Sequence, residues 1–277
     1  MAPRTEYLPP VRACLFDMDG LLLDTEDIYT LCVNLILDKY GKPPMPWSIK
    51  AKLQGRPGPA ATKIFHDWAD LPISVEEYVA ENSALQRKLF PGSKPLPGVP
   101  ELLDDLQSTR QEKQTVHIAL ATSSHQGNFQ LKTTHLTELF SVFPDNRRVM
   151  GDDTRLKVGR GKPLPDIFLL ALQTINDSLP EGETPIKPEE CLVFEDSVPG
   201  VEAGRRAGMR VIWCPHPKLK EEYAGREEDV LAGRTGEAGD VDLHQVGERN
   251  DGWSEYLPNL VDFPYEKYGI VIPPVKA

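Results

Sequence analysis

Four carboxylates, grouped in two pairs, are the residues of this sequence whose types and spacing point most directly to chemistry: Asp17, Asp19, Glu195 and Asp196. The first pair follows the apolar run Ala13–Phe16, and the second follows the apolar run Cys191–Phe194. Such runs are typical of central strands in a parallel sheet, whose ligand crevice lies beyond the carboxyl ends of the strands. Carboxylates gathered there raise each other's pKa values unless a hard divalent cation neutralises them. The pattern therefore predicts a Mg²⁺ site.

The first acidic pair has the spacing of a nucleophile and its proton partner. Asp17, at the end of a strand, could attack phosphorus, and Asp19 could protonate the leaving oxygen and later activate water. The alternative for an isolated D-x-D-G sequence is an Asx-turn. A calcium-binding EF-hand loop is disfavoured, because Leu15 would occupy its first ligand position and an apolar run stands where a helix is required.

Two polar groups further along the chain suit a bound phosphate. Thr122 ends the apolar run of HIALATSS, so its hydroxyl and the backbone N–H of Ser123 could bind a phosphate oxygen. Lys162 stands between a glycine and a proline in GKPLPD, where its ammonium could hold either a phosphate or a nucleophilic carboxylate. The alternatives are a helix N-cap for Thr122 and a surface lysine for Lys162.

The second acidic pair follows its strand without a spacer. Adjacent side chains at the end of a strand normally point in opposite directions. We therefore expect one of Glu195 and Asp196 to ligate the metal, and the other to fix a neighbouring group or a metal-bound water.

The order of the apolar patterns predicts an α/β fold. After the first strand and a helical region, strand-like and helical segments alternate along the chain: 115–121, 166–176, 191–194, 200–207 and 210–214. This order predicts a Rossmann-like parallel sheet with crossover helices.

An all-helical insert interrupts that pattern early. Apolar residues recur at helical spacing from Ile28 to Gly41, and Ser74 with Glu77 forms a capping box that opens another helix. We expect residues 24–91 to form a helical cap domain, inserted into a core domain made of residues 1–23 and 92–277.

Charge is unevenly distributed in the sequence. The formal net charge is −11, and residues 221–251 alone hold ten acidic and three basic side chains. We expect residues 217–252 to form a flexible acidic loop, and the aromatic-rich segment 253–272 to pack back onto the body. The negative charge argues against nucleic acid polymers or anionic membranes as partners.

Targeting and redox signals are few. The start of the chain lacks the apolar region of a secretory signal, and no run approaches the roughly 18 apolar residues of a membrane span. We therefore expect a cytoplasmic protein without a membrane partner. The four cysteines lack C-x-x-C spacing and lie in strand-like or helical apolar runs, which indicates reduced core thiols.

Taken together and in this order, the four motifs resemble those of the haloacid dehalogenase superfamily of aspartate-nucleophile phosphotransferases, over residues 12–215. The resemblance implies that Asp17 is the nucleophile, Asp19 the general acid and base, and Thr122 and Lys162 the phosphate holders. The metal ligands expected from the motifs and the resemblance are Asp17, Asp19, Asp196 and, as an ancillary ligand, Glu195. A cap between the first two motifs implies a small substrate, over which the cap closes.

A finer resemblance connects the runs DMDGLLLDTE, ALATSS, CLVFEDS and GVEA to the eukaryotic pseudouridine-5′-phosphatases and their relatives. Residues 217–252 and the lengthened approach to Lys162 depart from that pattern, which leaves the substrate open. A β-phosphoglucomutase-like mutase is disfavoured, because that pattern has a histidine in place of Tyr29 and an arginine near Gly58.

The expected function is Mg²⁺-dependent hydrolysis of a small phosphomonoester, a nucleotide such as pseudouridine 5′-phosphate or a sugar phosphate, through an aspartyl-phosphate. The alternatives are another phosphotransferase of the same fold, a dehalogenase, which would need neither the metal nor Asp19, and a non-catalytic binding protein. Side chains that could contact the leaving group are Gln54, Arg56, Lys63, Ser123 and His125. The sequence does not indicate the oligomeric state.

Overall fold

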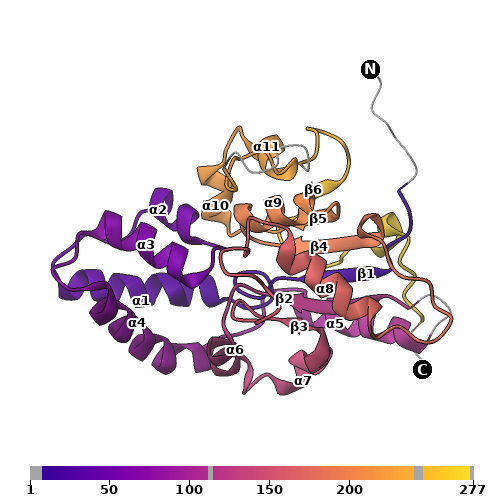
Figure 1. The fold of residues 1–277 in the computed structure, drawn as a ribbon, viewed down its shortest axis with the longest axis horizontal. Helices are drawn as coiled ribbons and strands as arrows, with labels where there is room; N and C mark the ends of the chain where they lie inside the picture. The colour runs from indigo at the N-terminus through magenta and orange to yellow at the C-terminus, as the bar shows by residue number, and fades with distance from the viewer. Residues whose placement is uncertain (1–7, 112–114, 240–245, 275–277) are drawn as a thin grey trace.

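The computed structural model describes residues 8–111, 115–239 and 246–274, and it confirms the predicted α/β fold (Figure 1). Six strands form one sheet in the order β3-β2-β1-β4-β5-β6, and each neighbouring pair is parallel. The strands are Ala13–Phe16 (β1), His117–Ala121 (β2), Arg148–Val149 (β3), Cys191–Glu195 (β4), Arg210–Trp213 (β5) and Ser254–Tyr256 (β6).

The register of the three central strands brings the predicted motifs to one edge of the sheet. Phe16 of β1 is paired with Leu120 of β2 on one side and with Phe194 of β4 on the other. The residues that follow these three positions therefore emerge at the same level, beyond the carboxyl ends of the strands. This is the edge where an open parallel sheet has its ligand crevice.

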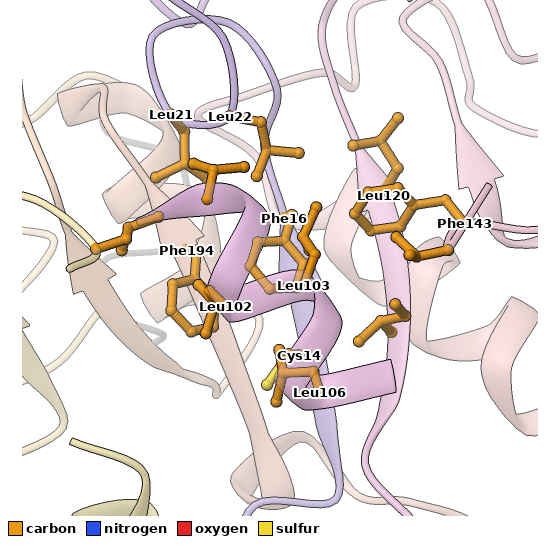
Figure 2. Close-up of a cluster of buried hydrophobic side chains, with 14 of the residues drawn as sticks. Cys14, Phe16, Leu21, Leu22, Leu102, Leu103, Leu106, Leu120, Phe143 and Phe194 are labelled. Carbon is orange, nitrogen blue, oxygen red and sulfur yellow. The ribbon is translucent and has the colours of Figure 1, made fainter. Parts of the chain in front are cut away.

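Helices cover both faces of the sheet. β1 is therefore buried along its whole length, although alternate side chains point to opposite faces. Figure 2 shows Cys14 and Phe16 packed against Leu102, Leu103 and Leu106 of helix α5 (Val99–Ser108). Ala13 and Leu15 point to the other face. They belong to an apolar cluster that also includes buried side chains of α8 (Asp166–Asn176) and α9 (Val198–Arg206). The two apolar clusters hold the sheet edge rigidly in place.

Four helices between β1 and α5 form a separate layer, which lies beyond the end of the sheet in Figure 1. They are α1 (Thr25–Lys39), α2 (Trp47–Leu53), α3 (Gly58–Ala69) and α4 (Val75–Leu89), followed by the 3₁₀ turn η1 (Phe90–Gly92). The layer has its own apolar cluster, which includes Phe65 and Tyr78. The predicted capping box of Ser74 and Glu77 is present at the start of α4. The domain boundaries at 24–91 stay a prediction.

The segment 217–252, predicted as a flexible acidic loop, is partly helical and is anchored to the core. The segment contains helices α10 (Pro217–Glu222) and α11 (Glu227–Leu231), and residues 240–245 lie outside the described residues. Its anchor is the buried carboxylate of Glu202, which accepts hydrogen bonds from the Thr235 hydroxyl and from the backbone N–H groups of Glu237 and Ala238. The composition of the segment predicted a loop because it does not reveal this anchor: Glu202, which accepts the hydrogen bonds, lies outside the segment.

The remaining elements connect the sheet to its helices. They are α6 (Gln126–Thr133), α7 (Thr137–Phe140), and the 3₁₀ turns η2 (Thr109–Gln111), η3 (Asp145–Arg147), η4 (Pro188–Glu190) and η6 (Tyr265–Tyr268). The strands β3 and β6 have only two and three residues and were not predicted. Among the described residues, each helix is too short or too polar to cross a membrane.

Candidate active site

A cavity of about 650 Å³ opens between the carboxyl edge of the sheet and the helical layer. Asp17 and Asp19 from the loop after β1, and Thr122, Ser123 and His125 from the loop after β2, line its core side. The wall contributed by the helical layer includes Tyr29, Lys50, Gln54, Arg56, Lys63, Asn82 and Gln86. The structure thus brings residues of the first two sequence motifs together at one cavity.

Asp17 stands directly at the end of β1 and is paired with a lysine from far along the chain. Its backbone N–H donates to the carbonyl of Phe194 at 3.1 Å, which extends the sheet pairing into the loop. Its Oδ1 atom pairs with the ammonium of Lys162, which also lies 2.7 Å from Glu195 Oε1 and donates to the Ala121 carbonyl at 3.0 Å. Lys162 is therefore fixed between the ends of β1, β2 and β4.

The charges of this group are unequal, because one ammonium serves two carboxylates. Burial, together with the neighbouring carboxylates of Glu195 and Asp19, raises the pKa of Asp17 to about 7, although Lys162 opposes the shift. Burial alone would lower the pKa of Lys162, but Asp17 and Glu195 outweigh it and raise the pKa. Lys162 therefore stays an ammonium. The positive charge around Asp17 is too small to keep its carboxyl group fully ionised near neutral pH.

Asp19 has a different set of partners. Its Oδ1 atom accepts hydrogen bonds from the Thr25 hydroxyl at 2.5 Å and from the Lys132 ammonium at 2.6 Å, while the Ser124 hydroxyl donates to Oδ2 at 2.6 Å. Burial opposes ionisation, but Lys132 and the hydrogen bonds together lower the pKa of Asp19. Two carboxylates that are two residues apart in the sequence thus differ in proton affinity.

Asp196 turns toward the helical layer, whereas its neighbour Glu195 does not. The side-chain amide of Gln54 donates to Asp196 Oδ2, and the indole N–H of Trp213 donates to the Asp196 backbone carbonyl at 3.0 Å. Burial, followed by the carboxylates of Glu195, Asp17 and Glu26, raises the pKa of Asp196. Glu195 Oε2 instead accepts from the backbone N–H of Ser197 at 3.1 Å and from its hydroxyl at 3.0 Å.

Gly20 is the residue that lets the two acidic loops approach. It has a φ of +80°, and a Cβ atom at this position would lie 2.2 Å from Asp196 Oδ2 and 2.7 Å from Glu26 Cγ. A side chain would therefore clash with the carboxylate and strain the backbone at once.

The donor set fits a hard divalent cation. Asp17 and Asp196 are both buried close to further carboxylates, which raises their pKa values and leaves them short of positive charge. Within the described ranges, no three His, Cys, Asp or Glu side chains already form a metal-ligating group. Mg²⁺ commonly uses only one or two carboxylates, and takes its other oxygens from water and substrate phosphate. Glu195, whose two oxygens face Lys162 and Ser197, is placed to fix that lysine.

The other predicted residues have identified contacts. The Thr122 hydroxyl is buried and accepts from the Ser124 backbone N–H at 3.1 Å, and the Ser123 hydroxyl donates to the Gly55 carbonyl at 3.0 Å. His125 caps α6, where its Nδ1 atom accepts from the backbone N–H of Asn128. These contacts fix the loop after β2 and connect it to the helical layer.

The predicted basic residues of the cavity are also paired. Arg56 forms an ion pair with Glu237 of the segment 217–239, and Lys63 lies 2.6 Å from Asp67 one helical turn away. The pair of Arg56 and Glu237 connects the helical layer to the segment that follows β5.

Sequence reasoning missed the residues around Asp19 and Glu26. Lys132 and Ser124, which are buried, and the partly buried Tyr29 form a hydrogen-bonded group next to Asp19, and Lys50 forms an ion pair with Glu26. The available signal for Lys132 was its place in an α6 face that also contains Phe129 and Thr133, both buried. A lysine on an apolar helix face requires a partner, and the acidic loop after β1 supplies it.

Comparison with known proteins gives consistent results. The family model of haloacid dehalogenase-like hydrolases matches residues 11–208. A Saccharomyces cerevisiae protein named "Probable pseudouridine-5′-phosphatase" is 46% identical over 224 residues, which cover 81% of this chain and 90% of the relative. The (DL)-glycerol-3-phosphatase 2 of Arabidopsis thaliana is 38% identical over 258 residues, covering 92% of this chain and 90% of the relative.

A solved structure agrees in fold. The crystal structure of a family IA, variant 3 hydrolase from Entamoeba histolytica superposes with a TM-score of 0.59 at 24% identity, and covers 78% of this chain and 89% of that chain. At this level of identity the likeness concerns the fold alone.

Proposed function

We propose that this chain cleaves small phosphomonoesters by way of a phosphorylated Asp17. The chain belongs to the haloacid dehalogenase-like hydrolase family and is a phosphoric monoester hydrolase. The observation that carries the proposal is the position of Asp17: it borders the cavity, is held by Lys162 and stands two residues from Asp19. This arrangement supplies a nucleophile, a cation beside it and a proton carrier at one point.

The proposed reaction has two steps. In the first, a carboxylate oxygen of Asp17 bonds to phosphorus, the bond from phosphorus to the leaving oxygen breaks, and Asp19 in its protonated form gives that oxygen a proton. In the second, Asp19 as a carboxylate takes a proton from water, the water oxygen attacks phosphorus, and Asp17 is released with inorganic phosphate. The lowered pKa of Asp19 favours the carboxylate form, which the second step uses. The first step needs the protonated form, which the negative charge of a phosphate bound beside Asp19 would favour.

Mg²⁺ is the cofactor that the carboxylate set best supports. Asp17 and Asp196 would hold it with their side chains, with Asp19 contributing from the same loop and Glu195 acting through Lys162. The bound cation would neutralise the charge that spreads over the phosphoryl oxygens in the transition state. Thr122, Ser123 and Lys162 would position those oxygens.

The charges of the cavity favour an uncharged leaving group. Each lysine or arginine described on its wall is paired with a carboxylate: Lys50 with Glu26, Arg56 with Glu237 and Lys63 with Asp67. A second phosphate on the substrate would therefore find Lys50 and Arg56 already neutralised within partly or fully buried pairs, and would meet Lys63, whose exposed pair with Asp67 is weak. Side-chain amides on the wall offer donors and acceptors instead, from Asn82, Gln86 and Asn128.

Cavity size favours a nucleoside or sugar over a smaller alcohol. A volume of about 650 Å³ is within the range of drug-sized ligand sites and exceeds what a glycerol group fills. We therefore propose a nucleoside monophosphate, such as pseudouridine 5′-phosphate, or a sugar monophosphate as the substrate. Glycerol 3-phosphate is the second candidate, because a relative that aligns with 92% of this chain is named for it.

The test is phosphate release by the purified protein with Mg²⁺, for pseudouridine 5′-phosphate, uridine 5′-phosphate, ribose 5-phosphate, glycerol 3-phosphate and a sugar bisphosphate. We expect the highest kcat/KM for a nucleoside or sugar monophosphate and the lowest for the bisphosphate. Asp17→Asn is the control for contaminating phosphatase. Preference for the bisphosphate would contradict the proposal of an uncharged leaving group.

The proposed partner is thus a small phosphomonoester. We also propose a cytoplasmic location, which imaging of the chain fused at its C-terminus to a fluorescent protein would test; an organellar signal would contradict it.

A further inference from the structure

A buried lysine lies directly behind Asp19. Lys132, on α6, has no exposed surface, and its ammonium is 2.6 Å from Asp19 Oδ1, 2.8 Å from the Tyr29 hydroxyl and 2.8 Å from Ser124 Oγ. Asp19, Tyr29 and Ser124 line the cavity, whereas Lys132 is absent from its wall. The ammonium therefore reaches the cavity only through these three side chains.

The surroundings of Lys132 fix the position of its ammonium. Three oxygen atoms take its three N–H donors, which offsets much of the cost of burying the charge. The ring centroids of Tyr29 and Phe90 each lie 4.6 Å from the Lys132 nitrogen, a distance at which an aromatic face attracts a cation. An ammonium held in this way has little freedom to turn toward a bound phosphate.

The same residues connect Lys132 to both ends of the helical layer. Tyr29 belongs to α1, by which the chain enters the layer, and Phe90 belongs to η1, by which the chain leaves it. Just beyond η1, the Ser93 hydroxyl donates to the Lys132 backbone carbonyl at 3.0 Å, and His135 Nε2 lies 2.7 Å from the Ser93 carbonyl. Lys132 therefore sits where the two connections of the proposed cap converge.

We propose that Lys132 is a positioning residue: it holds Asp19 Oδ1 so that the carboxylate of Asp19 keeps its direction toward the leaving group, and it joins that carboxylate to both connections of the cap. The inference rests on the proposed acid and base role of Asp19. Lys162 cannot share this task, because its ammonium is occupied by Asp17, Glu195 and the Ala121 carbonyl.

The test compares Lys132→Met, which keeps the length of the side chain and removes its charge, with Asp19→Asn and with the double variant. Lys50→Met is the matched control, since Lys50 is also buried and paired with a carboxylate, Glu26. Each variant is assayed with Mg²⁺ on an alkyl phosphate and on nitrophenyl phosphate, which needs little proton donation. Thermal melting of each variant reports whether it is folded.

We expect Lys132→Met to lower kcat roughly 100-fold on the alkyl phosphate and less than about tenfold on nitrophenyl phosphate, with KM within about threefold of wild type. The double variant should be no more than about twofold slower than Asp19→Asn, because both changes act on one group. Lys50→Met should lose the same factor on both esters, and its effect should multiply with that of Asp19→Asn.

If Lys132→Met does not fold, Lys132→Arg replaces it. The charge is kept, but a planar guanidinium cannot place one nitrogen at the same three oxygens, so the same dependence on leaving group is expected. Equal losses on both esters, losses that multiply with Asp19→Asn, a rise in KM alone, or wild-type kcat in the arginine variant would each overturn the inference. If Asp19→Asn itself shows no leaving-group dependence, the proposed role of Asp19 fails first, and the two failures are thereby distinguished.

Discussion

Two buried pairs of lysine and aspartate stand side by side in this molecule, and they differ in charge balance. Lys162 contacts two carboxylates, so burial and the second carboxylate raise the pKa of Asp17 to about 7. Lys132 contacts one carboxylate, which also receives two hydroxyl donors, and the pKa of Asp19 is lowered in spite of its burial. The same two residue types therefore produce opposite shifts.

The difference teaches how neighbouring carboxylates acquire separate roles. Where environments push two pKa values apart, two carboxylates can take different protonation states at a single pH. Without a cation or a bound phosphate the order is the reverse of what the proposed first step needs, and a cation beside Asp17 together with the negative charge of phosphate beside Asp19 would shift both pKa values toward the proposed roles. The direction follows from the donors and from the degree of burial: Asp17 is more deeply buried and shares its ammonium with Glu195, whereas Asp19 receives one ammonium and two hydroxyl donors. Asp17 lacks positive charge, which a cation can supply, whereas Asp19 is satisfied by side chains alone.

The largest expected effect comes from the nucleophile. Asp17→Asn should lower kcat by roughly 1,000-fold or more, because an amide does not attack phosphorus and the covalent route costs several kcal/mol to lose. The measurement is steady-state phosphate release, with thermal melting to confirm folding. A variant that retains activity within about tenfold of wild type would show that the raised pKa of Asp17 has no catalytic meaning.

The second effect should be smaller and should depend on the substrate. Asp19→Ala is expected to slow alkyl phosphate cleavage about 100-fold and nitrophenyl phosphate cleavage much less, since a good leaving group needs little proton donation. Single-turnover formation of the phosphorylated protein on both esters is the measurement. Identical losses would remove the distinction between the two aspartates.

The third effect concerns the cation and pH. The pKa of Asp17 is raised from the usual 3.8 to about 7 in the folded protein, so between these pH values the folded state binds more protons than the unfolded state. Without metal, the stability of the folded state therefore falls as pH rises from 3.8 to about 7. At one fixed Mg²⁺ concentration, about 100-fold above its Kd at pH 8, Mg²⁺ should raise the melting temperature by about 5–10 °C at pH 8 and by less at pH 6, where a protonated Asp17 has to lose its proton before it can hold the cation. Melting curves with Mg²⁺ and with a chelator test this.

The control for that experiment is Asp17→Asn, in which the difference between the two pH values should shrink. An equal Mg²⁺ effect at pH 6 and pH 8 in the wild-type protein would show that the carboxylates near Lys162 do not take up protons as inferred.

The smallest expected effects come from removing single hydroxyl groups next to Asp19 and next to Glu195. Ser124→Ala removes one donor from Asp19 and should lower kcat about fivefold, the value of one hydrogen bond of about 1 kcal/mol. Ser197→Ala removes a donor to Glu195 and the N-cap of α9, so it should cost about 1 kcal/mol of unfolding free energy with a smaller effect on kcat. The reverse ranking in kcat would contradict the comparison.

Much of the core could be predicted because strand ends and motifs coincide in the sequence. Short apolar runs marked β1, β4 and β5 closely, and the parallel register then requires their following residues to meet. Composition could not identify the partners of Asp19, because the sequence separation between Asp19 and Lys132 is 113 residues and an isolated lysine on a helix usually faces solvent. The pairing depends on how α6 packs against η1, which is tertiary information.

The helices and the anchor of the segment 217–239 could not be predicted, for the opposite reason. Its glycines and acidic residues are typical of a solvated loop, yet a single buried carboxylate, Glu202, binds three of its donors. Local composition reports what a segment lacks in apolar residues, and it does not report an anchor elsewhere in the fold.

That segment also gives the pair of Arg56 and Glu237 a kinetic meaning. The pair ties the wall of the cavity to the core, and both of its side chains keep a small exposed fraction, 18% and 17%. Salt weakens partly exposed ion pairs, so the escape of inorganic phosphate after each turnover should quicken as ionic strength rises. The lifetime of the product complex would then be set by a contact remote from phosphorus, and insertions or deletions in this segment would adjust it without altering the bond-breaking steps.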